Sequence, residues 1–154
     1  LLEYRMTSQL NVDTIVDKAG SGGTNVKVGN TSTYVSDGGA TTQNTVQGLA
    51  KAWTHFQGTS TAASVDGLNI SSVDDDGTGD YGLHFTNNMG NATYCVTFGI
   101  DDDGSASVVI GQDTTNGTMA TGNFDFEAYY VNSSSNRTNY DYANHYMVIT
   151  GDLA

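Results

Sequence analysis

Two aspartate-rich segments have the spacing that comes nearest to a metal site in this sequence. Asp74 and Asp76 match the first two oxygen ligands of an EF-hand loop, and a glycine follows at the sixth position. The twelfth position is Phe85 instead of a carboxylate, and a second segment at Asp101 and Asp103 lacks both the glycine and the final acid. Since Asp and Gly also form turns, we expect hairpin turns, with a weak divalent-cation site at Asp74/Asp76 or Asp101/Asp103 as the alternative.

Other residues that could do chemistry are scattered. The histidines, at positions 55, 84 and 145, have no local ligand spacing, and the sequence has no Gly-x-Ser-x-Gly elbow. Cys95 lies within an apolar run, where a thiol is usually an inert packing residue. Asp125 and Glu127 share one face of an expected strand and could act as a glycosidase pair, or simply form the wet face of a half-covered sheet. We therefore expect a protein that is not an enzyme and has no cofactor.

The segment from 128 to 142 is rich in tyrosine and asparagine. Aromatic rings stack on sugars and amides bond to hydroxyl groups, so this composition suits carbohydrate recognition. Our first candidates for glycan or receptor contact are Asn136, Arg137, Tyr140 and Tyr142. The same composition is typical of a long polar loop or of a contact between subunits, and both alternatives stay open.

Charge and composition exclude several classes of protein. The chain has 154 residues, 17 acidic and 5 basic, for a net charge of -12. Binding to nucleic-acid phosphates needs clustered Lys and Arg, so we expect no nucleic-acid partner. No run approaches the roughly 18 apolar residues of a membrane span, so we expect no membrane partner. A single cysteine excludes a disulfide within one chain.

The apolar residues that follow Trp53 alternate with polar ones, which is the period of a half-buried strand. The runs are Tyr81-Leu83-Phe85, Tyr94-Val96-Phe98-Ile100, Phe124-Phe126-Ala128-Tyr130 and Met147-Ile149. Turns rich in Gly, Asn and Asp separate them. The pattern predicts an all-β fold, an antiparallel β-sandwich of the jelly-roll-like kind.

The first forty residues differ from the rest. Short apolar segments between glycines indicate an extended N-terminal arm over 1–40, for attachment or oligomerisation, ahead of a β-sandwich head over 41–154. An ordinary edge strand is the alternative for this segment. Within 40–51, Val46, Leu49 and Ala50 have helical spacing, but Gly48 weakens it. We expect at most one short helix there, or none.

Several motifs between Val46 and Tyr94 resemble a known family. They read AKAW-x-x-F-x-G at 50–58, N-I-S-S-V at 69–73, D-x-G-T-G-D-Y at 75–81 and F-T-x-x-M-x-x-A-x-Y at 85–94. This stretch is similar to a domain of phage virion structural proteins, found in tail fibres of marine and cyanobacterial phages. Gly90 and Asp76 depart from the family pattern, both at turn positions.

The resemblance implies a non-enzymatic virion structural protein assembled as a homotrimer: a short fibre, a tail-fibre module or a capsid decoration. It implies a place on the phage particle surface or tail, and contact with other virion proteins through the N-terminal arm. A receptor-binding module for host surface glycan is the alternative function, and a polysaccharide depolymerase is a third. Residues expected in the core or at a subunit seam are Trp53, Phe56, Leu68, Ile70, Tyr81, Phe85, Tyr94, Val96, Phe98, Phe124, Phe126 and Ile149.

Overall fold

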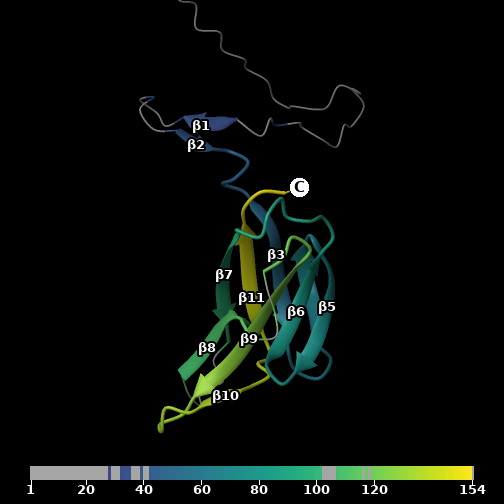
Figure 1. Cartoon of the computed structure of the whole chain (residues 1–154), viewed down its shortest axis with the longest axis vertical. Coiled ribbons are helices and arrows are strands. Elements are labelled where there is room, and N and C mark those ends of the chain that lie inside the picture. Colours follow the sequence, from purple (N-terminus) through teal and green to yellow (C-terminus); the bar gives the residue numbers. More distant parts are fainter. Residues whose placement is uncertain are drawn as a thin grey trace, which may run out of the picture.

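Two antiparallel sheets packed face to face form the body of the protein (Figure 1). The computed structural model describes residues 28, 32–35, 39, 42–101, 107–115, 117 and 119–153, and all regular elements within these ranges are strands. The expected all-β antiparallel sandwich is confirmed. Most of the arm expected over 1–40 lies outside the described residues, as does Asp103.

The four-stranded sheet has the order β4-β3-β11-β7. Its strands are β3 (Ala50–Gln57), β4 (Ala63–Leu68), β7 (Cys95–Ile100) and β11 (His145–Thr150). The five-stranded sheet has the path β10-β9-β6-β5, with β8 also paired to β9. Its strands are β5 (Ile70–Gly77), β6 (Asp80–Phe85), β8 (Ser107–Gln112), β9 (Asn123–Val131) and β10 (Arg137–Asn139). The last strand, β11, lies at the centre of the first sheet, between β3 and β7.

Alternation along each strand decides which residues enter the core. In β11, Met147 and Ile149 are buried, while the alternating residues Tyr146 and Val148 are exposed. Among the residues expected in the core or at a seam, those that are buried are Phe56, Tyr81, Phe85, Tyr94, Phe124, Phe126 and Ile149. Ile70, Val96 and Phe98 are partly buried and pack against this cluster.

Trp53 and Leu68 do not lie in the core. In β3, Ala52, Thr54 and Phe56 point inward, so Trp53 points to the opposite side of the sheet and is 37% exposed. Leu68 pairs with Trp53 across β4 and is 49% exposed. Of the two positions expected for these residues, core or subunit seam, only the seam fits their exposure.

Between β4 and β5 the chain passes from one sheet to the other, and a single residue, Asn69, separates the two strands. Its φ of 63° is in the left-handed region, which Asn tolerates better than most residues. The Asn69 side chain also bonds to the backbone of Asn87, accepting from its N–H at 2.7 Å and donating to its carbonyl at 3.0 Å. This corner brings the edge strands of the two sheets together.

No helix forms within the described part of 40–51. The chain makes β2 (Thr42–Asn44), a turn, and then β3. The Asn44 side chain accepts a hydrogen bond from the Gln47 N–H at 2.8 Å, and the Lys51 ammonium donates to the Leu49 carbonyl at 2.8 Å. These bonds stabilise a turn in place of the helix.

The remaining strand, β1 (Thr33–Val35), pairs only with β2, and the two form a separate two-stranded sheet. Figure 1 draws this hairpin beyond the end of the sandwich. Tyr34 and Val35 are both exposed, and Tyr34 is 64% accessible. The hairpin pairs with no other strand of the described chain. A two-stranded hairpin of this kind is at best marginally stable in water.

His145 occupies an unusual place at the centre of the core. Its ring is fully buried against the rings of Phe56, Tyr81 and Phe126, with centroids 5.2 to 5.8 Å away. Neither ring nitrogen has a hydrogen bond of good geometry. Burial lowers the pKa of His145 to about 4, and a backbone contact with Phe56 and the charges of Asp101 and Asp141 offset this only in part.

We predict that the fold loses stability in mild acid because of His145. The unfolded histidine binds a proton near pH 6.5, whereas the folded one does so near pH 4. The contribution is therefore fully present above pH 6.5 and declines as the pH falls to about 4, by up to about 3 kcal/mol. Urea unfolding at a series of pH values measures this. In His145→Phe the carboxylates still titrate, so the wild type should show the steeper loss; equal pH slopes in the two proteins would contradict the assignment.

Candidate functional site

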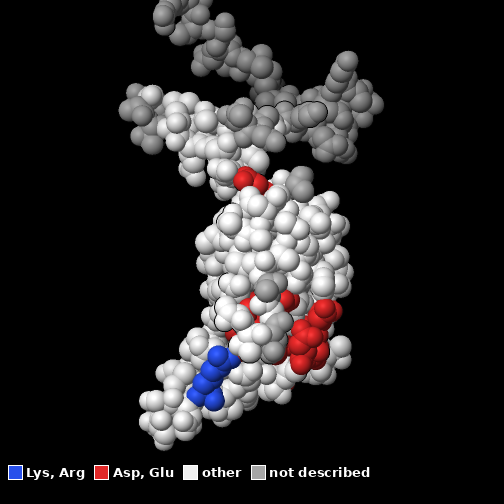
Figure 2. Space-filling view, in the orientation of Figure 1, with Lys and Arg blue, Asp and Glu red and all other residues white. Residues whose placement is uncertain are grey.

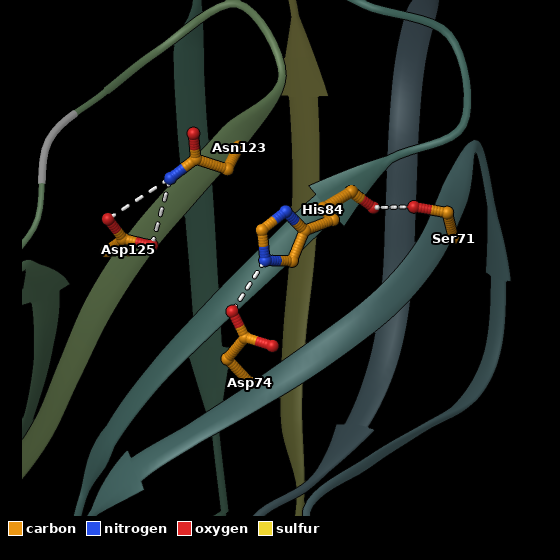
Figure 3. A network of polar contacts seen from close by, with 5 residues as sticks. All are labelled: Ser71, Asp74, His84, Asn123 and Asp125. Atoms are coloured by element: carbon orange, nitrogen blue, oxygen red, sulfur yellow. Dashed lines mark hydrogen bonds and ion pairs between the residues drawn. The ribbon is translucent and has the colours of Figure 1, made fainter.

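Ser71, Asp74 and His84 meet on the outer side of the β5–β6 pair (Figure 3), but they do not form a catalytic relay. The His84 Nε2 lies 2.6 Å from the Asp74 Oδ2. The Ser71 hydroxyl donates to the backbone carbonyl of His84, at 3.1 Å, and not to its ring. Both members of the His84–Asp74 pair are well exposed to solvent. The group ties β5 to β6, and no base in it reaches the serine hydroxyl.

Asp125 and Glu127, the acids expected on one face of β9, have separate partners. The Asp125 carboxylate accepts from the Asn123 side-chain amide at 3.2 Å. Glu127 forms an ion pair with Arg137 of β10. The Arg137 guanidinium also lies over the Tyr129 ring, 4.1 Å from its centroid. The Arg137 side chain therefore serves to hold β10 against β9.

Of the aspartates whose spacing resembled a cation site, Asp76 lies beside other aspartates, while Asp74 and Asp101 do not. Asp74 pairs with His84, and Asp101 accepts from the Asn144 amide at 2.7 Å. A pocket of about 230 Å³ is instead lined by the side chains of Asp76, Asp80, Asp113 and Asp125 with Gly117. Among the described residues, no group of three or more His, Cys, Asp or Glu is arranged to hold a metal ion. Local spacing could not reveal this pocket, because its residues come from four separate segments.

The four residues expected to contact glycan are placed very differently. Tyr142 is only 3% exposed, so the expectation that its ring stacks on a sugar is wrong. Its ring packs between those of Tyr140 and His145, at 4.8 and 6.3 Å. Arg137 is engaged with Glu127, whereas Tyr140 and Asn136 are exposed.

Asp141 fixes the loop that presents Tyr140. The Tyr81 hydroxyl lies 2.7 Å from Asp141 Oδ1, which also accepts from the Gly79 N–H at 2.6 Å. Burial, and next the bond to Asp141, raise the pKa of Tyr81 well above its usual value, so this hydroxyl stays protonated as a donor. Gly58 allows the close approach, because a Cβ there would lie 2.6 Å from the Tyr81 hydroxyl.

The outward side of the four-stranded sheet carries an apolar surface that the sequence pattern did not single out. One row across the strands is Leu68, Trp53 and Val148, which are paired in register and all exposed. A second row places His55 beside Tyr146, with the two rings stacked at 5.0 Å. We call these five residues the outer apolar face.

The centre and edge of this face are open. A groove of about 320 Å³ runs over β3, β11 and β7, with Trp53, Val148 and Tyr146 among its lining residues. Gly99, opposite Tyr146 on β7, helps to keep it open. Cys95 begins β7 and is exposed, so the expectation that it fills the middle of a strand is wrong.

One acidic residue, Asp66 of β4, is exposed and pairs with His55 in the second row of the outer apolar face, while a larger acidic cluster lies on the other sheet. Acidic side chains crowd the β5–β6 hairpin, where Asp74, Asp75 and Asp76 lie near the end of β5 and Asp80 begins β6, and Figure 2 shows this acidic cluster at the surface.

No helix within the described residues is long and apolar enough to cross a membrane.

Comparison with known proteins gives no relative: no protein-family model matches the sequence, and neither a curated protein nor a solved structure is significantly similar to it.

Proposed function

We propose that this chain is a non-enzymatic structural protein of a phage particle, built as a homotrimer. Its head, over 41–154, is the β-sandwich, and its arm, over 1–40, contacts sibling chains or neighbouring virion proteins. The protein would act as a short fibre, a tail-fibre module or a capsid decoration on the particle surface or tail. The motifs between Val46 and Tyr94 that resemble phage virion proteins support the virion setting.

The observation that carries the proposal is the contrast between the head and the hairpin before it. The sandwich has its own packed core, whereas β1 and β2 pair only with each other and expose Tyr34 and Val35. A hairpin of this size gains stability when it packs on another surface or extends another sheet. An arm that is completed by a partner, in front of a head that folds by itself, suits a protein whose work is assembly.

The side chains that could do chemistry fit this proposal as well. The Ser71 hydroxyl is bound to a backbone carbonyl, and Asp125 and Glu127 are bound to different partners. The Ser71 and Glu127 contacts join neighbouring strands, and the Asn123–Asp125 bond lies within β9. Incubation with host polysaccharide should leave the polymer length unchanged, and depolymerisation would count against a structural role.

We predict that the full chain is trimeric in solution. Light scattering coupled to size-exclusion chromatography should give a mass about three times the 16.2 kDa of one chain. Removal of residues 1–41 tests the arm, because the remaining head keeps the whole core and should stay folded by circular dichroism. If the arm joins sibling chains, the shortened trimer should dissociate at a higher concentration than the full chain. A wild-type protein that stays monomeric at all concentrations would contradict the proposed assembly.

Recognition of host glycan is the second candidate, favoured by the exposed Tyr140 ring. This ring lies edge-on to Tyr130, at 5.9 Å, and its loop is held to the core by Asp141. Asn136 is exposed in the turn that precedes β10, where its N–H donates to the Asn132 side chain at 3.0 Å. An exposed aromatic ring whose loop is held in place can stack on a sugar, and exposed amides can bond to its hydroxyl groups.

We predict that Tyr140→Ala reduces adsorption to host cells and binding on a glycan array by about tenfold or more if this candidate is right, a loss of ~1.4 kcal/mol. Tyr140→Phe keeps the ring and should bind nearly normally. Thr138→Ala removes an exposed side chain from the neighbouring strand β10 and serves as the control. Equal binding by Tyr140→Ala and the wild type would remove Tyr140 from the account.

A further inference from the structure

We infer that the outer apolar face is the surface through which one copy of this chain contacts a sibling copy. The inference rests on the proposed function in that it takes the protein to self-associate, and it adds the surface that does so. The face consists of Leu68, Trp53, Val148, His55 and Tyr146, on β4, β3 and β11.

The chemistry of the face favours a protein over a sugar as its partner. Leu68 and Val148 flank Trp53 with aliphatic groups, which gain most from contact with other apolar groups. One ring nitrogen of His55 is already engaged, because its Nε2 lies 2.8 Å from the Asn144 side-chain oxygen. The Asn144 amide in turn donates to Asp101 at 2.7 Å. Covering the face therefore breaks few hydrogen bonds with water, while a sugar would find few groups to bond.

The distribution of charge makes an identical copy a suitable partner. Each chain has a net charge of -12, so two copies repel unless their carboxylates stay apart. The acidic cluster of Asp74, Asp75, Asp76 and Asp80 belongs to the other sheet, so that Asp66, which pairs with His55 on the edge strand β4, is the acidic residue within the rows of the face. In a trimer whose three outer apolar faces turn toward the threefold axis, the acidic cluster of each copy lies on the sheet that faces outward, separated from the contact by the distance between packed sheets, about 10 Å. That separation exceeds the Debye length of about 8 Å at physiological salt.

The size of the face also suits a contact between subunits. Four strands at about 4.8 Å spacing, each six to eight residues long at about 3.4 Å per residue, give a flat projection of roughly 400–500 Å². This projection of the whole sheet is about half or more of the roughly 800 Å² that each partner buries in a standard interface. Trp53 lies at the middle of its row, between Leu68 and Val148, where energetically dominant residues concentrate.

Val148→Lys tests the face by placing a charge next to Trp53. The matched control is Thr138→Lys, which adds the same side chain at an exposed position of β10, on the other sheet. Light scattering over a dilution series should show the control assembled like the wild type. Val148→Lys should dissociate at a concentration at least about tenfold higher, with unchanged far-ultraviolet circular dichroism.

The unmodified protein offers two native probes, so the test does not depend on the variant folding. Trp53 is the sole tryptophan, and Cys95, the sole cysteine, is exposed at the edge of the same sheet. Dilution below the dissociation concentration should shift Trp53 emission to the red, increase its quenching by acrylamide and speed the alkylation of Cys95.

The outcomes separate this inference from the proposed function. A trimer that survives Val148→Lys, with Trp53 equally quenched before and after dilution, overturns the face and leaves the homotrimer standing. A wild-type chain that is monomeric throughout overturns both. Unchanged assembly together with lost glycan binding in Val148→Lys would assign the face to glycan and overturn a contact between copies.

Discussion

Contact between aromatic rings across the two sheets is the interaction on which the rest of this structure depends. Phe56 of β3 meets Tyr81 of β6 at 4.8 Å and Phe126 of β9 at 5.5 Å, so a single side chain joins the sheets. Each such ring pair adds about 0.5–1.5 kcal/mol beyond its burial. The same cluster encloses His145 and, through the Tyr81 hydroxyl, holds Asp141 and the loop that presents Tyr140. The order of the exposed loop thus follows from the packing of the core.

Because the aromatic cluster fills the interior, the outer sides of the sheets are free to differ. The five-stranded sheet carries the acidic groups and the His84–Asp74 pair, while the four-stranded sheet carries Trp53, Val148 and Tyr146. Period-two alternation permits this, since each strand chooses its inner and outer residues independently. The outer side of one sheet is rich in acidic groups and that of the other in apolar groups, and the two coexist in a chain of high net charge.

The sequence allowed the sheet architecture to be predicted, because alternation is local. The runs through Tyr81, Phe126 and Ile149 fold inward as expected. Pairing between distant strands is not local, so the sequence pattern did not indicate that the Tyr142 ring packs between those of Tyr140 and His145 and is buried. Trp53, expected in the core or at a subunit seam, lies outside the core. The pocket lined by Asp76, Asp80, Asp113 and Asp125 draws on four segments, so no spacing within one segment could have indicated it.

The arrangement of the edge strands β4 and β5 favours contact between copies through the outer apolar face over pairing of strands at these edges. A strand at an edge exposes unpaired backbone groups and invites uncontrolled growth of the sheet. Here β4 and β5 are joined at Asn69, so the edge of one sheet is brought beside the edge of the other. A bulge between His55 and Phe56 further interrupts the pairing of β3 with β4, which disfavours addition of a straight strand there. Contact through side chains on a face is limited by the complementarity of the two surfaces, so an assembly built in this way can close at a defined number of copies.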